Sequence, residues 1–223
     1  NMRTLLLLLL SFAAWAQKTN CSYELAMQKQ GLLEVSSNAP GVMVELKYAT
    51  ADNFMGKDVY GCLQHAYVQK PVLAMLKKAQ AALEKKHPGY HLLIYDAARP
   101  LSIQWILWNT LTQYKPAERQ KYVANPKEHS IHNYGSALDL TVADAQGKPL
   151  DMGTKFDFFG DLAYPSKEKA LLAAGKLSQT AYQNRLILRE AMQAAGFMRI
   201  EFEWWHFNAF SRAEAKRRFP VVQ

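Results

Sequence analysis

Two short segments, far apart in the chain, each combine an imidazole with a carboxylate. Residues 130–139 place His132 and Asp139 on either side of a glycine-containing turn, and a later segment contains Glu203 and His206. Segments that fold back on each other can bring such side chains to one metal ion. The fold of this chain is therefore constrained most by the need for these two segments to meet.

The residue types in the two segments suit catalysis by zinc. Three protein ligands leave the fourth position of zinc open for water, as a catalytic site requires. A remaining glutamate can take a proton from that water and return it to a leaving amine. Imidazole and carboxylate ligands favour zinc without excluding another divalent metal. From spacing alone, packed core histidines and a turn carboxylate at Asp139 are equally good interpretations.

The spacing of Glu203 and His206 raises a geometric problem. Side chains alternate along a regular strand, so residues three apart face opposite sides. If both groups serve one site, a bulge or a strand end near Trp205 must turn one of them.

The first residues have the make-up of a secretory signal peptide. Met2 and Arg3 give a positive start, leucine fills positions 5–10, and Ala14 and Ala16 are small residues suited to cleavage. The apolar run is too short for a confident membrane span. We expect a leader at residues 1–16, with Asn1 left by cloning, and one mature domain at residues 17–223; an uncleaved anchor is the alternative.

Composition indicates a soluble globular domain without a nucleic-acid partner. Hydrophobic residues make up 49% of the chain and charged residues 21%, and no repeat or linker divides it. The net charge of +8 comes without an aromatic–basic recognition motif, so attraction to an anionic cell envelope, or simple solvation, explains it better. Cys21 and Cys62 lack metal-type spacing and could pair in an oxidising compartment.

Periodicity predicts helices and strands in irregular order. Pro71 begins a helix over residues 72–86, Ser102 caps one over 102–114, and Gly196 ends one over 178–195. We expect strands at residues 91–96, 137–142 and 199–207. Without regular strand–helix alternation, this favours an α+β fold with one small, mostly antiparallel sheet flanked by helices.

Several motifs together resemble the zinc D-alanyl-D-alanine dipeptidases of the VanX type. The two segments described above resemble the signature pair of that family. Further matches lie, in order along the chain, at residues 47–50, 52–54, 96–100 and 152–158, so that the resemblance spans residues 46–207. It implies a Hedgehog/D,D-peptidase-like fold, one Zn²⁺ per chain and hydrolysis of D-Ala-D-Ala to D-alanine.

The resemblance also implies a role for each matched residue. His132, Asp139 and His206 would ligate zinc, and Glu203 would be the general acid/base. Arg99 would stabilise the oxyanion that forms when water attacks the peptide carbonyl, because a guanidinium is always charged and offers several donors. A structural salt bridge between Arg99 and Asp96 is the alternative.

Three further matched positions would contact the substrate. Asp157 would hold its free ammonium group, and Tyr48 and Ser130 lie at positions that resemble substrate-side or supporting residues. His129 lies outside the matched pattern, so we expect it to support the site or to lie on the surface.

A leader peptide would move this activity out of the cytoplasm. We expect a periplasmic enzyme that acts on dipeptide released from the cell wall, in salvage or peptidoglycan turnover, without stable membrane insertion after cleavage. A zinc D,D-carboxypeptidase of longer wall peptides and a non-catalytic zinc-bearing binding module are the competing interpretations. The sequence does not indicate an oligomeric state.

Overall fold

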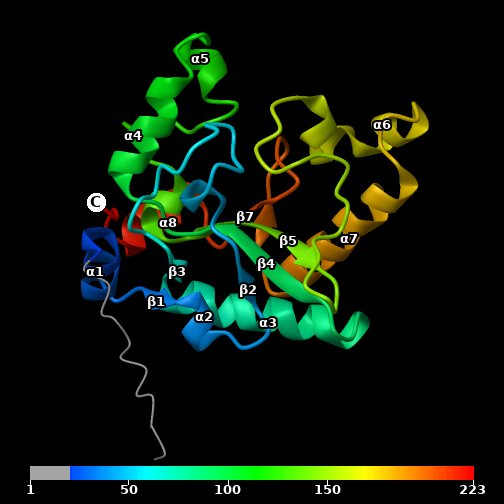
Figure 1. The fold of residues 1–223 in the computed structure, drawn as a ribbon, viewed down its shortest axis with the longest axis horizontal. Helices are drawn as coiled ribbons and strands as arrows, with labels where there is room; N and C mark the ends of the chain where they lie inside the picture. Colours follow the sequence, from blue (N-terminus) through cyan, green and yellow to red (C-terminus); the bar gives the residue numbers. More distant parts are fainter. Residues whose placement is uncertain (1–20) are drawn as a thin grey trace, which may run out of the picture.

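A five-stranded sheet forms the centre of the structure, a computed structural model that describes residues 21–223 (Figure 1). The strand order is β2–β4–β5–β7–β6, and only the β2–β4 pair is parallel. The strands are β2 (Met43–Val44), β4 (His91–Asp96), β5 (Ala137–Ala143), β6 (Met198–Arg199) and β7 (His206–Asn208). The prediction of an α+β chain with a small, mostly antiparallel sheet is confirmed. The predicted leader, residues 1–16, lies outside the described residues.

Helices and a second, two-stranded sheet surround the central sheet. The helices are α1 (Ser22–Lys29), α2 (Val35–Asn38), α3 (Lys70–Lys86), α4 (Leu101–Thr110), α5 (Pro116–Arg119), α6 (Glu168–Ala173), α7 (Gln179–Ala194) and α8 (Arg212–Arg218). Short 3₁₀ turns are η1 (Lys47–Ala49), η2 (Ile131–Tyr134), η3 (Asp161–Ala163) and η4 (Pro165–Lys167), and the small sheet pairs β1 (Leu33–Glu34) with β3 (Tyr67–Val68). Among the described helices, none has the length and apolar character needed to cross a membrane.

One face of the central sheet carries the hydrophobic core. Helices α3 and α7 pack together and contact β4 and β5 (Figure 1). The buried strand side chains on this face belong to Leu92, Ile94, Leu138, Leu140 and Val142. The opposite face carries a smaller buried cluster of Leu93, Tyr95 and Ala143 together with the polar side chains described below.

The long helices begin and end where their sequence signals lie. Pro71 occupies the first turn of α3, where its missing N–H costs no hydrogen bond. The Ser178 hydroxyl accepts from Ala181 N at 3.0 Å and caps α7. Beyond the end of α7, Gly196 has φ 91°, and Phe197 N donates back to Met192 O at 3.1 Å.

Two boundary predictions are wrong. Helix α4 begins at Leu101, because Pro100 occupies the N-cap position, and it ends at Thr110. Ser102 therefore lies inside the helix, where its hydroxyl is 3.1 Å from Tyr23 Oη. The strand expected at residues 199–207 is two short antiparallel strands, β6 and β7, joined by an irregular loop. An aromatic-rich run fits either arrangement, so its composition does not reveal the turn.

Candidate metal centre and active site

Three ionisable side chains lie in a row across neighbouring strands. Asp96, at the end of β4, is the register partner of Asp139 in β5, and Asp139 is the partner of His206 in β7. Cross-strand partners project from the same face of a sheet. The polar face of the central sheet therefore gathers these groups at one point.

A β-bulge in β4 places Asp96 in that row. Ile94 pairs with Leu140 and Asp96 with Asp139, so Tyr95 is an extra residue in β4. Strict alternation would turn Asp96 toward the helix-covered face. The inserted residue turns it to the polar face instead, as bulges near functional sites commonly do.

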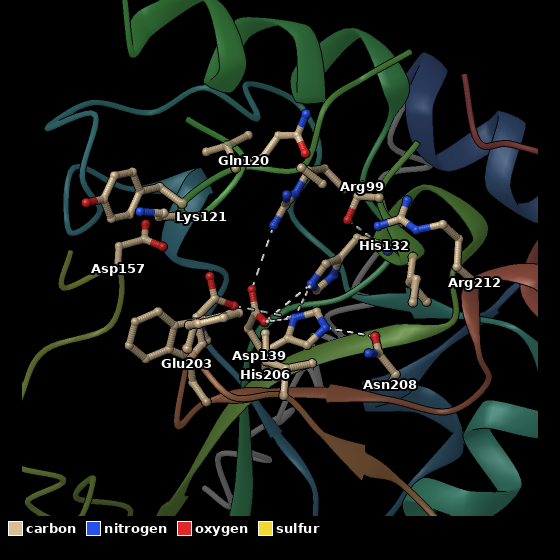
Figure 2. A pocket seen from close by; sticks show the side chains of 18 of the residues that line it. Arg99, Gln120, Lys121, His132, Asp139, Asp157, Glu203, His206, Asn208 and Arg212 are labelled. Atoms are coloured by element: carbon tan, nitrogen blue, oxygen red, sulfur yellow. Dashed lines mark hydrogen bonds and ion pairs between the residues drawn. The ribbon is translucent and has the colours of Figure 1, made fainter. Parts of the chain in front are cut away.

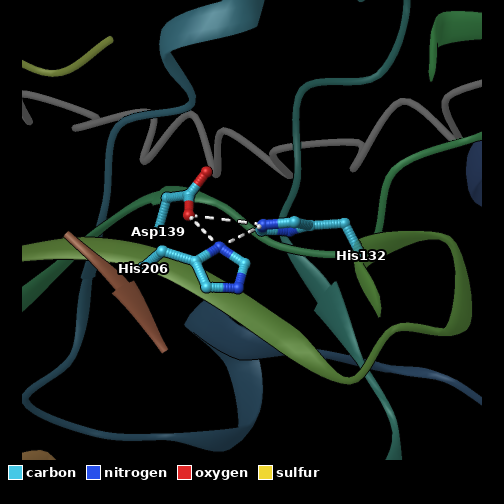
Figure 3. A group of neighbouring side chains, drawn as sticks. All are labelled: His132, Asp139 and His206. Carbon is cyan, nitrogen blue, oxygen red and sulfur yellow. Dashed lines mark hydrogen bonds and ion pairs between the residues drawn. The ribbon is translucent and has the colours of Figure 1, made fainter. Parts of the chain in front are cut away.

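His132, Asp139 and His206 form a compact triangle of ligand atoms (Figure 3). His206 Nδ1 lies 3.0 Å from Asp139 Oδ1 and 3.2 Å from His132 Nε2, which is 3.3 Å from Asp139 Oδ1. Ligands bonded at about 2.0–2.1 Å in a tetrahedron stand about 3.3 Å apart. The triangle therefore has the size and the nitrogen–oxygen donor set that a zinc ion requires.

Hydrogen bonds on the far side of each ring orient both histidines. His132 Nδ1 donates to Ala97 O at 2.8 Å, and His206 Nε2 donates to Asn208 Oδ1 at 2.8 Å. His132 Nε2 and His206 Nδ1 are thus the ring nitrogens that face the centre of the triangle, where they could bind a metal ion. Burial alone would raise the pKa of Asp139, but the two imidazoles hold it well below its usual range.

The turn that carries His132 is rigidly built. Ser130 caps η2: its hydroxyl accepts from His132 N at 3.3 Å, while Ser130 N donates to Asn133 Oδ1 at 2.7 Å. Gly135 ends the turn with φ 62°, and a Cβ there would meet Leu32 Cδ2 at 2.9 Å. Ser130, predicted to face the substrate, lines the cavity and also fixes this turn.

Arg99 lies between two carboxylates above the triangle (Figure 2). Its Nη2 is 2.5 Å from Asp96 Oδ2 and 3.7 Å from Asp139 Oδ2, and Nη1 donates to Gln104 Oε1 at 2.9 Å. Burial opposes its charge, but Asp96 holds the Arg99 pKa above its usual value. The salt bridge considered as an alternative role therefore exists, and it fixes the guanidinium at the edge of the cavity.

Glu203 approaches the triangle from the loop before β7. Its Oε2 lies 3.8 Å from His206 Nδ1. Strand β7 begins only at His206, so alternation does not apply and both side chains reach one site. Burial raises the pKa of Glu203 to about 8, with His206 opposing and Asp139 adding to the rise. A carboxyl with this pKa can both accept and donate a proton near neutral pH.

Asp157 closes one end of the cavity in a strained backbone conformation. It has φ 61°, a region that few residues other than glycine adopt. Tyr48 Oη donates to Asp157 Oδ1 at 3.1 Å, and Phe54 N donates to Oδ2 at 3.4 Å. Burial and then Asp139 raise the pKa of Asp157 to about 8. The buried Tyr48 thus contacts Asp157, and its ring lies 5.3 Å from the Arg99 guanidinium.

These residues line one cavity of about 200 Å³ (Figure 2). That is below the range of about 300–1,000 Å³ that is usual for drug-sized ligands, and it suits a short peptide. All eight residues predicted from the sequence lie in its wall: Tyr48, Arg99, Ser130, His132, Asp139, Asp157, Glu203 and His206. Polar side chains at the rim include Gln120, Lys121, Asn208 and Arg212.

A model of the D-Ala-D-Ala dipeptidase family, within the M15 peptidases, matches residues 28–223. The chain belongs to this dipeptidase family. Two D-alanyl-D-alanine dipeptidases are similar over most of their length. That of Escherichia coli (strain K12) is 35% identical, covering 79% of this chain and 83% of the relative. That of Enterococcus faecalis (strain ATCC 700802 / V583) is 34% identical, covering 81% and 92%.

A solved structure of the LD-carboxypeptidase LdcB is more distantly similar to this dipeptidase-family chain. Its TM-score is 0.40 at 19% identity, and the match covers 68% of this chain and 63% of that chain.

Two residues that support this dipeptidase-family site, Tyr60 and Asn208, were missed by sequence reasoning, whereas Asp96 was the expected salt-bridge partner of Arg99. Asp96 holds Arg99, Tyr60 Oη donates to Asp96 Oδ1, and Asn208 accepts from His206. Asn208 had a usable signal, since it follows His206 by two residues and shares its face of a strand. Tyr60 had none, because only the folded loop brings it to β4. His129 contacts Tyr134 Oη at 3.0 Å, outside the triangle.

A second cavity, of about 420 Å³, lies behind the wall of the first. Consecutive residues face opposite sides of this wall: Tyr48, Asp157 and Trp205 line the first cavity, while their chain neighbours Lys47, Phe156 and Trp204 line the second. The Phe156 ring contacts Tyr48 and Trp205, with centroid distances of 5.8 and 5.4 Å. The partition is therefore one residue thick.

Proposed function

We propose that this chain is a zinc metallopeptidase that hydrolyses D-Ala-D-Ala to two D-alanine molecules. The observation that carries the proposal is the triangle of His132, Asp139 and His206, which lies in a small cavity together with Glu203 and Arg99. Membership of the D-Ala-D-Ala dipeptidase family supports the same substrate. Bound in the triangle, zinc would supply Lewis acidity toward the peptide carbonyl and toward water.

Glu203 and Arg99 supply the protein's part in bond cleavage. Glu203 takes a proton from the attacking water and gives it to the amine that leaves. Its raised pKa suits both transfers. Arg99 is held by Asp96 and Gln104 at the edge of the cavity, and its fixed charge would stabilise the carbonyl oxygen as that oxygen becomes negative. Such fixed donors stabilise a transition state without reorganisation.

Asp157 recognises the amino end of the substrate. An ammonium beside this half-buried carboxyl favours its charged form and offsets the cost of desolvation. A peptide with a blocked amino end presents no such charge and would leave Asp157 unpaired. This end of the cavity therefore favours a free dipeptide over the end of a longer chain.

We further propose that the enzyme acts in the periplasm, in salvage or turnover of wall-derived dipeptide. The leader-like residues 1–16 support export. So does the disulfide between Cys21 and Cys62, because such bonds persist in oxidising compartments. Cell fractionation tests the location. Growth of a deletion strain on D-Ala-D-Ala tests the role, and growth equal to that of the parent strain would argue against salvage.

Amine release from matched substrates tests the activity. D-Ala-D-Ala, L-Ala-L-Ala and N-acetyl-D-Ala-D-Ala are each incubated with the protein, with chelator, and with chelator followed by zinc. We expect zinc-dependent cleavage of the free D,D-dipeptide alone. Cleavage of the acetylated substrate would instead identify a carboxypeptidase, and no cleavage of any substrate would favour a binding module.

A further inference from the structure

Arg212 is a cavity residue that the proposed chemistry does not use. It is the first residue of α8, it is exposed, and its side chain lines the active-site cavity. Figure 2 shows Arg212 and Asp157 on opposite sides of the triangle formed by His132, Asp139 and His206. The cavity thus has a carboxyl group at one end and a guanidinium at the other.

One edge of the Arg212 guanidinium is anchored to the protein. Nη1 donates to Glu128 O at 3.2 Å and to His129 O. Within residues 21–223, no carboxylate forms an ion pair with Arg212, whereas Arg185, Arg189 and Arg218 each have one. Its orientation is thus fixed while its charge is left uncompensated by the described part of the chain.

The other cations of the cavity are placed differently. Arg99 is already bound by Asp96 and Gln104. Lys121 is exposed and is drawn on the Asp157 side of the view in Figure 2. Arg212 is therefore the cation available opposite the amino-binding end.

From this arrangement we infer that Arg212 binds the C-terminal carboxylate of the substrate and makes the enzyme selective for dipeptides with a free carboxyl end. The inference rests on the proposed dipeptidase function. A zwitterionic dipeptide lies with its ammonium at Asp157 and its carboxylate at Arg212, which brings its peptide bond over the metal triangle. A guanidinium suits the carboxylate end because it donates two parallel hydrogen bonds to such a group.

Hydrolysis of D-Ala-D-Ala is compared with that of D-alanyl-D-alaninamide, which has no terminal charge. Arg212→Gln should lower kcat/KM for the free acid by about 10- to 100-fold, because it removes a charged hydrogen bond. The same variant should change kcat/KM for the amide by less than about twofold. Arg212→Lys should recover part of the loss. KM for the acid should rise with salt more steeply in the wild type than in Arg212→Gln, because only the wild type has both charged contacts.

Two control variants separate recognition from structure. Arg217→Gln removes an exposed arginine from the same helix but outside the cavity, and Lys121→Gln removes the cation drawn near Asp157. Neither should change the ratio of acid to amide hydrolysis. An equal loss on both substrates in Arg212→Gln would show that Arg212 only anchors residues 128–129, and no loss would place the carboxylate elsewhere. Failure of the proposed function differs from both, because wild-type protein would then leave D-Ala-D-Ala intact.

Discussion

Glu203 and Asp157 both have a pKa raised to about 8, but their neighbours assign them different tasks. Glu203 lies within 3.8 Å of a histidine of the metal triangle, where a proton can be exchanged with the reacting groups. Asp157 is hydrogen-bonded by Tyr48 and Phe54 and stays fixed at the far end of the cavity. Position within the cavity, more than acidity, separates the base from the binding group.

Replacing Glu203 should abolish proton transfer without emptying the metal site. Glu203→Gln keeps the size of the side chain, and we expect kcat to fall by about 10²- to 10⁴-fold with zinc content unchanged. Glu201→Gln is the control, because Glu201 is exposed, pairs with Arg199 and lies outside the cavity. Wild-type kcat in a metal-loaded Glu203→Gln protein would refute the assigned role.

The raised pKa of Asp157 predicts how pH affects the metal-free protein. In the unfolded chain this carboxyl loses its proton near pH 4, but in the folded chain it keeps it until about pH 8. Raising the pH across this window therefore favours the unfolded state. Asp157→Asn removes the effect. With chelator present, the Tm of the variant minus the Tm of the wild type should therefore increase between pH 5 and pH 9. A constant difference in Tm would contradict the shifted pKa.

At the scale of elements, β7 supplies both a metal ligand and the group that orients it. His206 and Asn208 project from the same face, and their hydrogen bond leaves Nδ1 free for the metal. Asn208→Ala should weaken zinc affinity by about 10- to 100-fold, the usual effect of removing such a partner. Competition with a chromophoric chelator measures this. Asn184→Ala, on α7, is the control. Equal zinc affinities of Asn208→Ala and the wild type would show that the hydrogen bond between Asn208 and His206 does not support metal binding.

The sequence predicts those elements whose signals are local. Helices α3 and α7 have an apolar stripe with proline, serine or glycine at their ends, and β4 and β5 are short, mostly apolar segments. The β6–β7 hairpin and the bulge at Tyr95 depend on pairing between distant strands. The spacing of Glu203 and His206 indicated a strand end near Trp205 if both serve one site, but no local pattern indicated the bulge at Tyr95.

The candidate site follows the same division. The cavity-lining residues matched a family motif, so their types and order were visible in the chain. Asp96, the expected partner of Arg99, belongs to a matched segment, but Tyr60 acts on Arg99 through Asp96 and only the folded loop brings it to the end of β4. Supporting residues of this kind are found from contacts rather than from patterns.

At the scale of the whole molecule, the disulfide ties α1 to the loop that supports Arg99. Cys21 and Cys62 are 41 positions apart, and their Cα atoms lie 5.3 Å from each other. The Glu24 carboxylate in α1 accepts from Gln64 N at 2.9 Å in the same loop. The loop also contains Tyr60, which donates to Asp96. Covalent closure therefore stabilises a segment that reaches the active site.

Removing the disulfide should destabilise the protein without removing its metal. Replacing both Cys21 and Cys62 by serine should lower the free energy of unfolding by about 2–4 kcal/mol, measured by urea denaturation. Zinc content should stay unchanged, because neither cysteine lies in the triangle. The reduced wild type is the matched comparison. Equal stability of the oxidised and serine proteins would contradict the expectation.

The one-residue partition between the two cavities offers a way to alter reactivity without touching a ligand. Phe156 meets no substrate, yet its ring supports both Tyr48 and Trp205 from behind. With a smaller side chain at position 156, Tyr48 and Trp205 could move toward the second cavity. The active-site cavity would then accept dipeptides with residues bulkier than D-alanine. Laboratory selection for new dipeptides should therefore yield changes at Lys47, Phe156 and Trp204, positions that a search of the active-site lining alone would overlook.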